Sequence, residues 1–153
     1  MLWTSDVRGA STHGDVYLGF GGREFSVDRE EEDFEQGDVI SYTFGEGTNV
    51  RFPDFNDPRD PQLLTEDAVR QPVYIRFAPQ DRTDNWNVDN VSVTVNGNLS
   101  PIWWTRRLAN VPKRGIWLGV HAGLIVHLPL QAPSSEQAMQ IERVIIEQVA
   151  RVS

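Results

Sequence analysis

Hydrophobic and polar residues alternate with a period of two along several short runs of the chain, which is the pattern of half-buried β-strands. Residues 15–20 and 23–27 are two such runs, and the glycine pair between them accepts the positive φ angles of a tight turn. These runs predict a β-hairpin. Further strands are expected where β-branched and aromatic residues gather, at residues 39–44, 73–77, 91–95, 102–105, 116–120 and 124–128.

Two regions depart from this alternation. Residues 53–72 are dominated by Asp, Pro and Asn, so any regular structure there must be short, such as one helical turn over 63–69. From Pro133 onward the apolar period becomes helical, and Ser134 with Gln137 forms a capping-box pattern. The sequence therefore predicts a C-terminal amphipathic helix at about 135–151. Its apolar positions are Ala138, Ile141, Ile145, Val149 and Val152.

The length and composition favour one folded domain. A chain of 153 residues can bury well over half of its unfolded surface in a single core, and a hydrophobic fraction of 39% is enough to fill it. We therefore expect a single, mostly β domain over residues 1–153.

Charge and missing motifs exclude several functions. Fourteen Lys and Arg against 22 Asp and Glu give a net charge of -8, which repels nucleic acid and anionic head groups at long range. Without cysteine there is no disulfide, thiolate zinc site or cysteine nucleophile. The chain also has neither a Gly-x-Ser-x-Gly elbow nor a Gly-Lys-Ser/Thr phosphate loop. We predict that it is not an enzyme.

Targeting segments are not expected in this chain. Its start, Met1–Asp6, lacks a basic segment followed by an apolar run, and no stretch of 18 apolar residues occurs. The sequence predicts a soluble protein with neither a signal peptide nor a transmembrane helix. Bacterial cytoplasmic and secreted locations both stay open.

Oxygen-rich loops offer the best candidate chemistry, because Ca²⁺ takes six to eight oxygen ligands from carboxylates, amides and carbonyls. One candidate cluster combines Asp6 with the loop up to Asp15, and the other spans residues 81–90, which include Asp84 and Asp89. We take these four Asp residues as candidate calcium ligands. The alternative is that Asp and Asn in these segments cap turns through bonds to backbone amides.

Tryptophan supplies a second kind of candidate site, because exposed aromatic rings hold sugar rings and lipid tails. Trp103 and Trp104 are adjacent, so in a strand their side chains face opposite sides and at least one leaves the main core. We take both as candidate ligand-binding residues, with core packing as the alternative. Trp86 and Trp117 belong to the same group of candidates.

Three motifs follow one another between about residues 3 and 97. Thr4–Leu18 reads Thr-Ser-Asp-Val-Arg-Gly-Ala-Ser-Thr-His-Gly-Asp-Val-Tyr-Leu, Asp33–Gly37 reads Asp-Phe-Glu-Gln-Gly, and Trp86–Val93 reads Trp-Asn-Val-Asp-Asn-Val-Ser-Val. In this order they resemble the opening, middle and closing motifs of a PLAT/LH2 domain. The resemblance implies an antiparallel, eight-stranded β-sandwich related in shape to C2 domains, which meets lipid surfaces or partner proteins.

The resemblance also implies roles for single residues. In several relatives calcium bound at loop ends assists membrane attachment; Asp6 matches the motif Asp of the first loop and Asp89 that of the closing strand. Trp86 matches the aromatic residue expected beneath them. Gly14-Asp15 stands where the family has Asp-Ala, which weakens the case for calcium in that loop.

Residues 98–153 lie outside the match and form a β-rich extension that ends in the predicted helix. Fifty-six residues without cysteine make a marginal core, so we expect the extension to dock on the sandwich. The leading functional hypothesis is a binding module for a lipid surface or a protein partner, assisted by calcium. The alternatives are a carbohydrate-binding module that uses exposed Trp, and a structural accessory domain.

Overall fold

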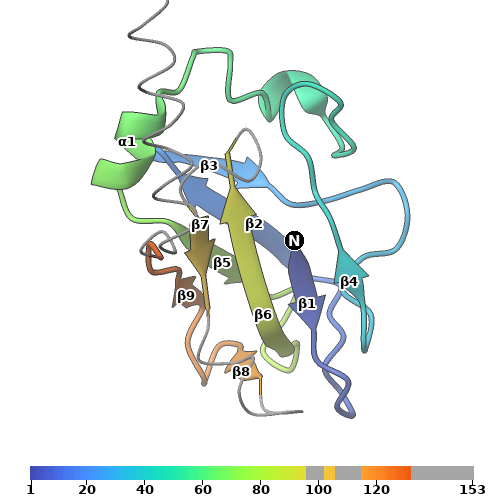
Figure 1. The fold of residues 1–153 in the computed structure, drawn as a ribbon. Helices are drawn as coiled ribbons and strands as arrows, with labels where there is room; N and C mark the ends of the chain where they lie inside the picture. Colours follow the sequence, from blue (N-terminus) through green and yellow to red (C-terminus); the bar gives the residue numbers. More distant parts are fainter. Residues whose placement is uncertain (96–101, 106–114, 132–153) are drawn as a thin grey trace, which may run out of the picture.

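The computed structural model describes residues 1–95, 102–105 and 115–131 of the chain, and these residues form a mostly β fold. Two antiparallel sheets account for all the strands of this part, with one short α-helix and one 3-10 turn beside them (Figure 1). The arrangement is consistent with a β-sandwich.

The first sheet is built around the longest strand, β6 (Trp86–Thr94). Its order is β4-β1-β6-β7, and β8 pairs with the first part of β6 while β7 pairs with the last part. The flanking strands are β1 (Leu2–Thr4), β4 (Val39–Ile40), β7 (Ile102–Trp104) and β8 (Ile116–Leu118).

The second sheet has the order β3-β2-β5-β9. It contains β2 (Asp15–Phe20), β3 (Arg23–Ser26), β5 (Tyr74–Ala78) and β9 (Ile125–His127). The predicted hairpin is confirmed: β2 and β3 pair from Phe20↔Arg23 outward, and the two glycines of the turn have φ of +58° and +80°.

The core lies between the two sheets, where buried residues from both of them form one cluster. Trp86 on β6 and Phe77 on β5 are both fully buried, and their ring centroids are 5.9 Å apart. Phe34 packs edge-on against Trp86 at 5.2 Å. The indole Nε1 of Trp86 donates a hydrogen bond of 3.1 Å to Thr4 Oγ1. Trp86 is therefore a core residue and not an exposed aromatic.

Two strand predictions need correction here, and one strand was missed. The run 39–44 forms a strand only at Val39–Ile40, because the side chain of Asn49 binds the Thr43 amide and the Ser41 carbonyl in place of a neighbouring strand. The predicted strand 91–95 begins earlier, at Trp86. The three-residue strand β1 was not predicted, since so short a run carries no visible alternation.

The connection at 53–72 contains only short elements, as predicted: the 3-10 turn η1 (Pro53–Phe55) and the helix α1 (Thr65–Arg70). The strands that follow residue 98 are not a separate layer. β7 and β8 pair with β6, and β9 pairs with β5, so the extension supplies strands to both sheets. The predicted C-terminal helix lies outside the described residues.

Candidate functional site

Three loops gather at one end of the fold, which we call the loop end: residues 5–14, 79–85 and 119–124. The Oγ1 hydroxyl of Thr12 donates to Asp84 Oδ1 at 2.7 Å, joining the first two loops. The amide of Asn87 donates to the Ala10 carbonyl at 3.1 Å, and the side chains of Ser5 and Asn87 are also hydrogen-bonded. The first loop is therefore bonded directly to the second loop and to the start of β6.

The third loop packs against the second. A methyl group added at Gly119 would overlap the Asn85 side chain and come within 3.4 Å of the Asp84 carbonyl. The Phe77 amide donates to the Leu124 carbonyl at 2.8 Å, which ties the other side of the loop to the end of β5. A side chain at 119 would therefore have to displace the side chain of Asn85.

The loop 119–124 exposes apolar side chains to solvent. Its turn is closed by a hydrogen bond of 2.9 Å from the Gly119 amide to the Gly123 carbonyl. Val120 is 47% exposed and Leu124 is 40% exposed. On the strands beside the turn, Trp117 is 42% exposed and Ile125 is 46% exposed. We call these four residues the apolar tip.

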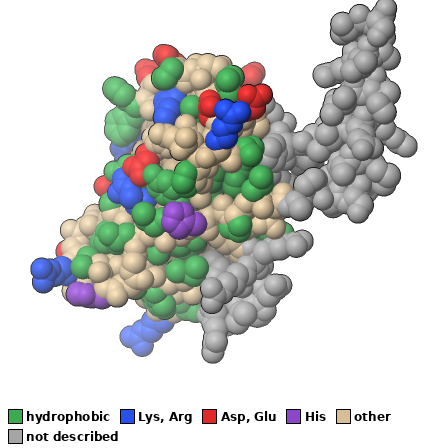
Figure 2. Space-filling model, turned by 90° about the vertical axis from the view of Figure 1, so that its left-hand side faces the viewer, with side chains coloured by type: hydrophobic (Ala, Val, Ile, Leu, Met, Phe, Trp, Pro, Cys, Tyr) green, Lys and Arg blue, Asp and Glu red, His purple; other side chains and the backbone are tan. Residues whose placement is uncertain are grey.

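Figure 2 views the side of the molecule that carries β9 and α1, and hydrophobic side chains reach the surface there among charged ones. Two of the apolar tip residues lie where β9 begins: Ile125 is its first residue, and Leu124 directly precedes it. Scattered single hydrophobic residues are ordinary on a protein surface, whereas a group at a loop tip indicates an interaction site.

The candidate calcium ligands do not converge. Asp6 follows β1 and accepts a bond of 2.9 Å from Gln36 Nε2, while Asp15 is exposed at the start of β2. Asp84 precedes β6 and has partners on both oxygens, Thr12 Oγ1 and the Gln80 amide at 2.9 Å. Asp89 is half-buried within β6. Among the described residues, no group of three or more His, Asp or Glu is placed to hold a metal ion.

The acidic side chains of the second loop instead shape its turn. Asp81 Oδ1 accepts bonds from the Thr83 amide and hydroxyl, both at 2.7 Å, and from the Asp84 amide at 3.0 Å. The Thr83 hydroxyl, helped by these backbone amides, lowers the pKa of Asp81 below its ordinary value. This is the turn-capping role that competes with calcium binding for Asp residues in loops.

The two candidate ligand-binding tryptophans lie on opposite faces of β7, as the adjacent positions predict. Trp103 is 3% exposed and packs edge-on against Phe20, with ring centroids 5.3 Å apart. Trp104 is half-buried, and its Nε1 donates to Asn90 Oδ1 at 2.6 Å. Trp103 therefore has almost no ring surface open to a ligand.

Val120 and Leu124 were not predicted as site residues. The sequence predicted two strands at 116–120 and 124–128, which placed both residues inside strands. In the structure β8 ends at Leu118 and β9 begins at Ile125, so both lie in the turn. The flanking glycines at 119 and 123 were the available signal, since such pairs mark a tight turn.

Comparisons with protein-family models, curated proteins and solved structures found no match to this chain. No helix of the described residues is long and apolar enough to cross a membrane.

Proposed function

We propose that this chain is a non-catalytic binding module that engages a lipid surface through its loop end. The observation that carries the proposal is the apolar tip, in which four large hydrophobic side chains are each at least 40% exposed around one tight turn. The order of the PLAT-like motifs in the sequence supports the same interpretation.

The chemistry of the apolar tip suits the boundary between head groups and acyl chains. An indole ring such as that of Trp117 combines an apolar body with a polar N–H and is favoured at this boundary. Val120 and Leu124 would enter the apolar layer, each gaining the transfer free energy of a buried aliphatic side chain. The hydrogen bonds that tie the turn to β5 keep this tip in place before binding.

The lipid surface that we propose is neutral in net charge. The chain carries a net charge of -8, so an anionic membrane repels it at long range. Calcium assistance stays a prediction, and it has its own test: calcium at about 1 mM, where extracellular modules bind it, should raise the melting temperature. An unchanged melting temperature would remove calcium from the proposal. It would not affect the proposed role of the apolar tip in lipid binding.

Co-sedimentation with phosphatidylcholine vesicles tests the proposal. The variant Val120→Ser/Leu124→Ser should lower the vesicle partition coefficient by about tenfold or more, since it removes two aliphatic groups from the inserted surface. Val69→Ser is the matched control, because Val69 is 51% exposed on α1, away from the loop end. Equal partitioning of the double variant and the wild type would contradict the proposal.

Carbohydrate binding is the second candidate, and one observation favours it: the Trp117 ring on β8 is 42% exposed and could serve as a stacking surface. A sugar that stacks on this ring would change the tryptophan fluorescence of the wild type and not of Trp117→Ala. A glycan array read in parallel separates this candidate from the lipid surface. An accessory role in a larger assembly would instead show as one protein partner, without dependence on lipid or glycan.

A further inference from the structure

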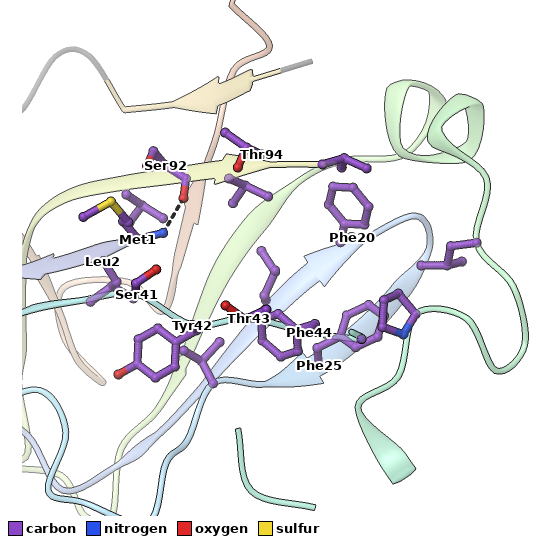
Figure 3. Close-up of a pocket in the computed structure, with 18 of the residues that line it drawn as sticks. Met1, Leu2, Phe20, Phe25, Ser41, Tyr42, Thr43, Phe44, Ser92 and Thr94 are labelled. Atoms are coloured by element: carbon purple, nitrogen blue, oxygen red, sulfur yellow. Dashed lines mark hydrogen bonds between the residues drawn. The ribbon is translucent and has the colours of Figure 1, made fainter. Parts of the chain in front are cut away.

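A pocket of about 750 Å³ opens to solvent between the two sheets, at the end of β6 away from the loop end. Figure 3 shows Phe20, Phe25 and Phe44 around this space, opposite Ser92 and Thr94 of β6. Small-molecule sites in proteins have volumes of about 300–1,000 Å³ and combine apolar walls with a few polar groups. The size of this pocket lies within that range.

The inner walls of the pocket are apolar. Alternate side chains of a strand point to the same face of its sheet, so the inner faces of both sheets line the space. Some of these side chains are buried, and others are only half-buried although they pack against the core. The buried ones include Leu18, Phe25 and Ile75, and the half-buried ones include Phe20, Phe44 and Val93. An apolar ligand that covers the half-buried group removes more of its surface from water, which favours binding.

The rim of the pocket is polar. Thr43 and Thr94 carry hydroxyl groups, Gln62 carries an amide, and all three residues are exposed. They come from three separate parts of the chain: the loop after β4, the last residue of β6 and the segment before α1. Hydroxyl and amide groups both donate and accept hydrogen bonds, so they suit a head group that carries hydroxyls. The pocket is therefore amphipathic, with an apolar interior and a polar opening.

The charges at the rim select against an ionised head group. Two of the described residues that line the pocket carry charged side chains, Glu46 and Arg59. Arg59 is already held by Asp57: its Nε donates to Oδ1 at 2.9 Å and its Nη2 to Oδ2 at 2.7 Å. These side-chain bonds lower the pKa of Asp57 to about 2, so the pair stays ionised at neutral pH. An anionic head would have to compete with Asp57 for Arg59.

A cationic head gains little at the same rim. Glu46 is exposed, and an ion pair between exposed groups contributes little because water and salt screen it. The uncharged hydroxyl and amide groups of Thr43, Thr94 and Gln62 are the better partners. The rim therefore favours a neutral head.

We propose that this pocket binds one molecule of a neutral amphiphile, whose acyl chain lies between the two sheets and whose hydroxyl-bearing head lies at the rim. The chain contacts Phe20, Phe44 and Val93, and the head bonds to Thr43 and Thr94. A monoacylglycerol is the simplest molecule of this class. The proposal goes beyond engagement of a lipid surface and does not rest on it, because the pocket and the apolar tip lie at opposite ends of β6.

Titration calorimetry with three amphiphiles of equal chain length tests the class of ligand. The probes are 1-decanoylglycerol, decanoate and decyltrimethylammonium, each below its critical micelle concentration and at two temperatures. 1-Decanoylglycerol should bind as one molecule per chain, with a dissociation constant about tenfold below those of the charged probes, since an ionised head meets only paired or exposed charges. Absence of saturable binding, or binding of either charged probe as tight as that of 1-decanoylglycerol, would overturn the proposal.

Variants test the place of binding. Phe44→Ser/Val93→Ser removes two apolar contacts and should raise the dissociation constant of 1-decanoylglycerol by about tenfold or more. Val69→Ser is the matched control, because Val69 is exposed on α1 and does not line the pocket. Unchanged affinity in the pocket variant would overturn the proposal.

The loop-end variant Val120→Ser/Leu124→Ser separates this proposal from the lipid surface. It should bind 1-decanoylglycerol as the wild type does, even though its partition to vesicles falls. A loss of 1-decanoylglycerol binding in this variant would place the amphiphile at the loop end and overturn the pocket as its site.

Photolabelling of the wild type gives a measurement that does not depend on the folding of a variant. The probe is a 1-decanoylglycerol analogue with a diazirine on its acyl chain, and peptide mass spectrometry locates the label after irradiation. The label should be concentrated in residues 18–27, 41–46 and 91–95, which line the pocket. A label that is absent from these segments, or no denser there than at residues 119–125, would overturn the proposal.

Discussion

The two ends of the space between the sheets are filled in different ways. Near the loop end, Trp86, Phe77 and Phe34 pack against one another and Trp86 has no exposed surface. At the other end the same two sheets enclose a pocket of about 750 Å³ lined by Phe20 and Phe44. Aromatic residues alone therefore do not close the core. What differs is that Phe34 packs edge-on against Trp86 at the first end, whereas the pocket at the other end is open to solvent.

The largest expected effect tests the packed end. Trp86→Ala removes the largest fully buried side chain and leaves its Thr4 hydrogen-bond partner unsatisfied. We expect a loss of about 3–5 kcal/mol in the free energy of unfolding, measured by urea denaturation. A loss below about 1 kcal/mol, typical of surface substitutions, would show that this end is not the tightly packed one.

Close backbone packing at the same end predicts the next effect. A methyl group at Gly115 would overlap Asn87 Oδ1, Ser5 Oγ and the Val88 carbonyl oxygen. Gly115→Ala should cost about 1–3 kcal/mol, because neither the buried side chains nor the strand backbone can move away freely. Gly47→Ser is a useful contrast of strain without crowding: its φ is +70° and nothing lies within 4 Å of an added Cβ. Thermal melting of both variants measures the two effects, and Gly115→Ala should lower the melting temperature more than Gly47→Ser does.

Phe44→Ala tests the hollow end. Phe44 is half-buried and its ring centroid lies 5.6 Å from that of Phe25, so we expect a loss of about 1–2 kcal/mol. Urea denaturation measures this loss. A loss below about 0.5 kcal/mol, the range of ordinary surface substitutions, would show that the Phe44 ring is not packed against Phe25.

The smallest effect belongs to the outer face of the second sheet, where pH is the variable. Arg76 donates bidentate bonds to Glu24 at 2.8 and 2.6 Å, and Tyr74 adds one at 3.0 Å. The Arg76 side chain, more than that of Tyr74, lowers the pKa of Glu24 below its ordinary value of 4.5. The stabilisation is therefore present above about pH 4.5 and is lost as the pH falls through the lowered pKa of the folded state.

Glu24→Gln should thus destabilise the protein by up to about 1 kcal/mol at pH 7, the value of an exposed ion pair. The difference from the wild type should shrink as the pH drops below 4.5, where the wild-type carboxylate takes up a proton. Melting curves of both proteins at pH 7 and pH 3 check that the destabilisation by Glu24→Gln is larger at pH 7. A difference that grows on acidification would contradict the assigned pair.

The strands were predictable where the alternation was long enough. The hairpin of residues 15–26 followed from its glycine pair and alternating side chains. The strand ending at Phe44 was overextended because the competing bonds come from the side chain of Asn49, which sequence alternation does not reveal. Strand β6 was underextended because Asn87 and Asn90 look like loop residues, yet each is buried and hydrogen-bonded to a neighbouring strand or loop.

The candidate site was only half predictable. The sequence singled out the first two loops of the loop end as two separate clusters, and the structure joins them through the bond between Thr12 and Asp84. It did not single out Val120 and Leu124, since strand-forming residues look alike whether they enter a core or project from a turn. Their exposure depends on where β8 ends and where β9 begins. Pairing in both sheets sets these two points, because β8 pairs with β6 and β9 pairs with β5.

A fluorophore placed at the apolar tip tests the central claim most directly. The chain has no cysteine, so Val120→Cys can carry a single nitrobenzoxadiazole group, with Val69→Cys as the matched label on α1. On addition of phosphatidylcholine vesicles, the label at position 120 should shift to the blue and become brighter, and the label at position 69 should not change. No change at position 120, or the same change at both positions, would contradict lipid engagement through the loop end.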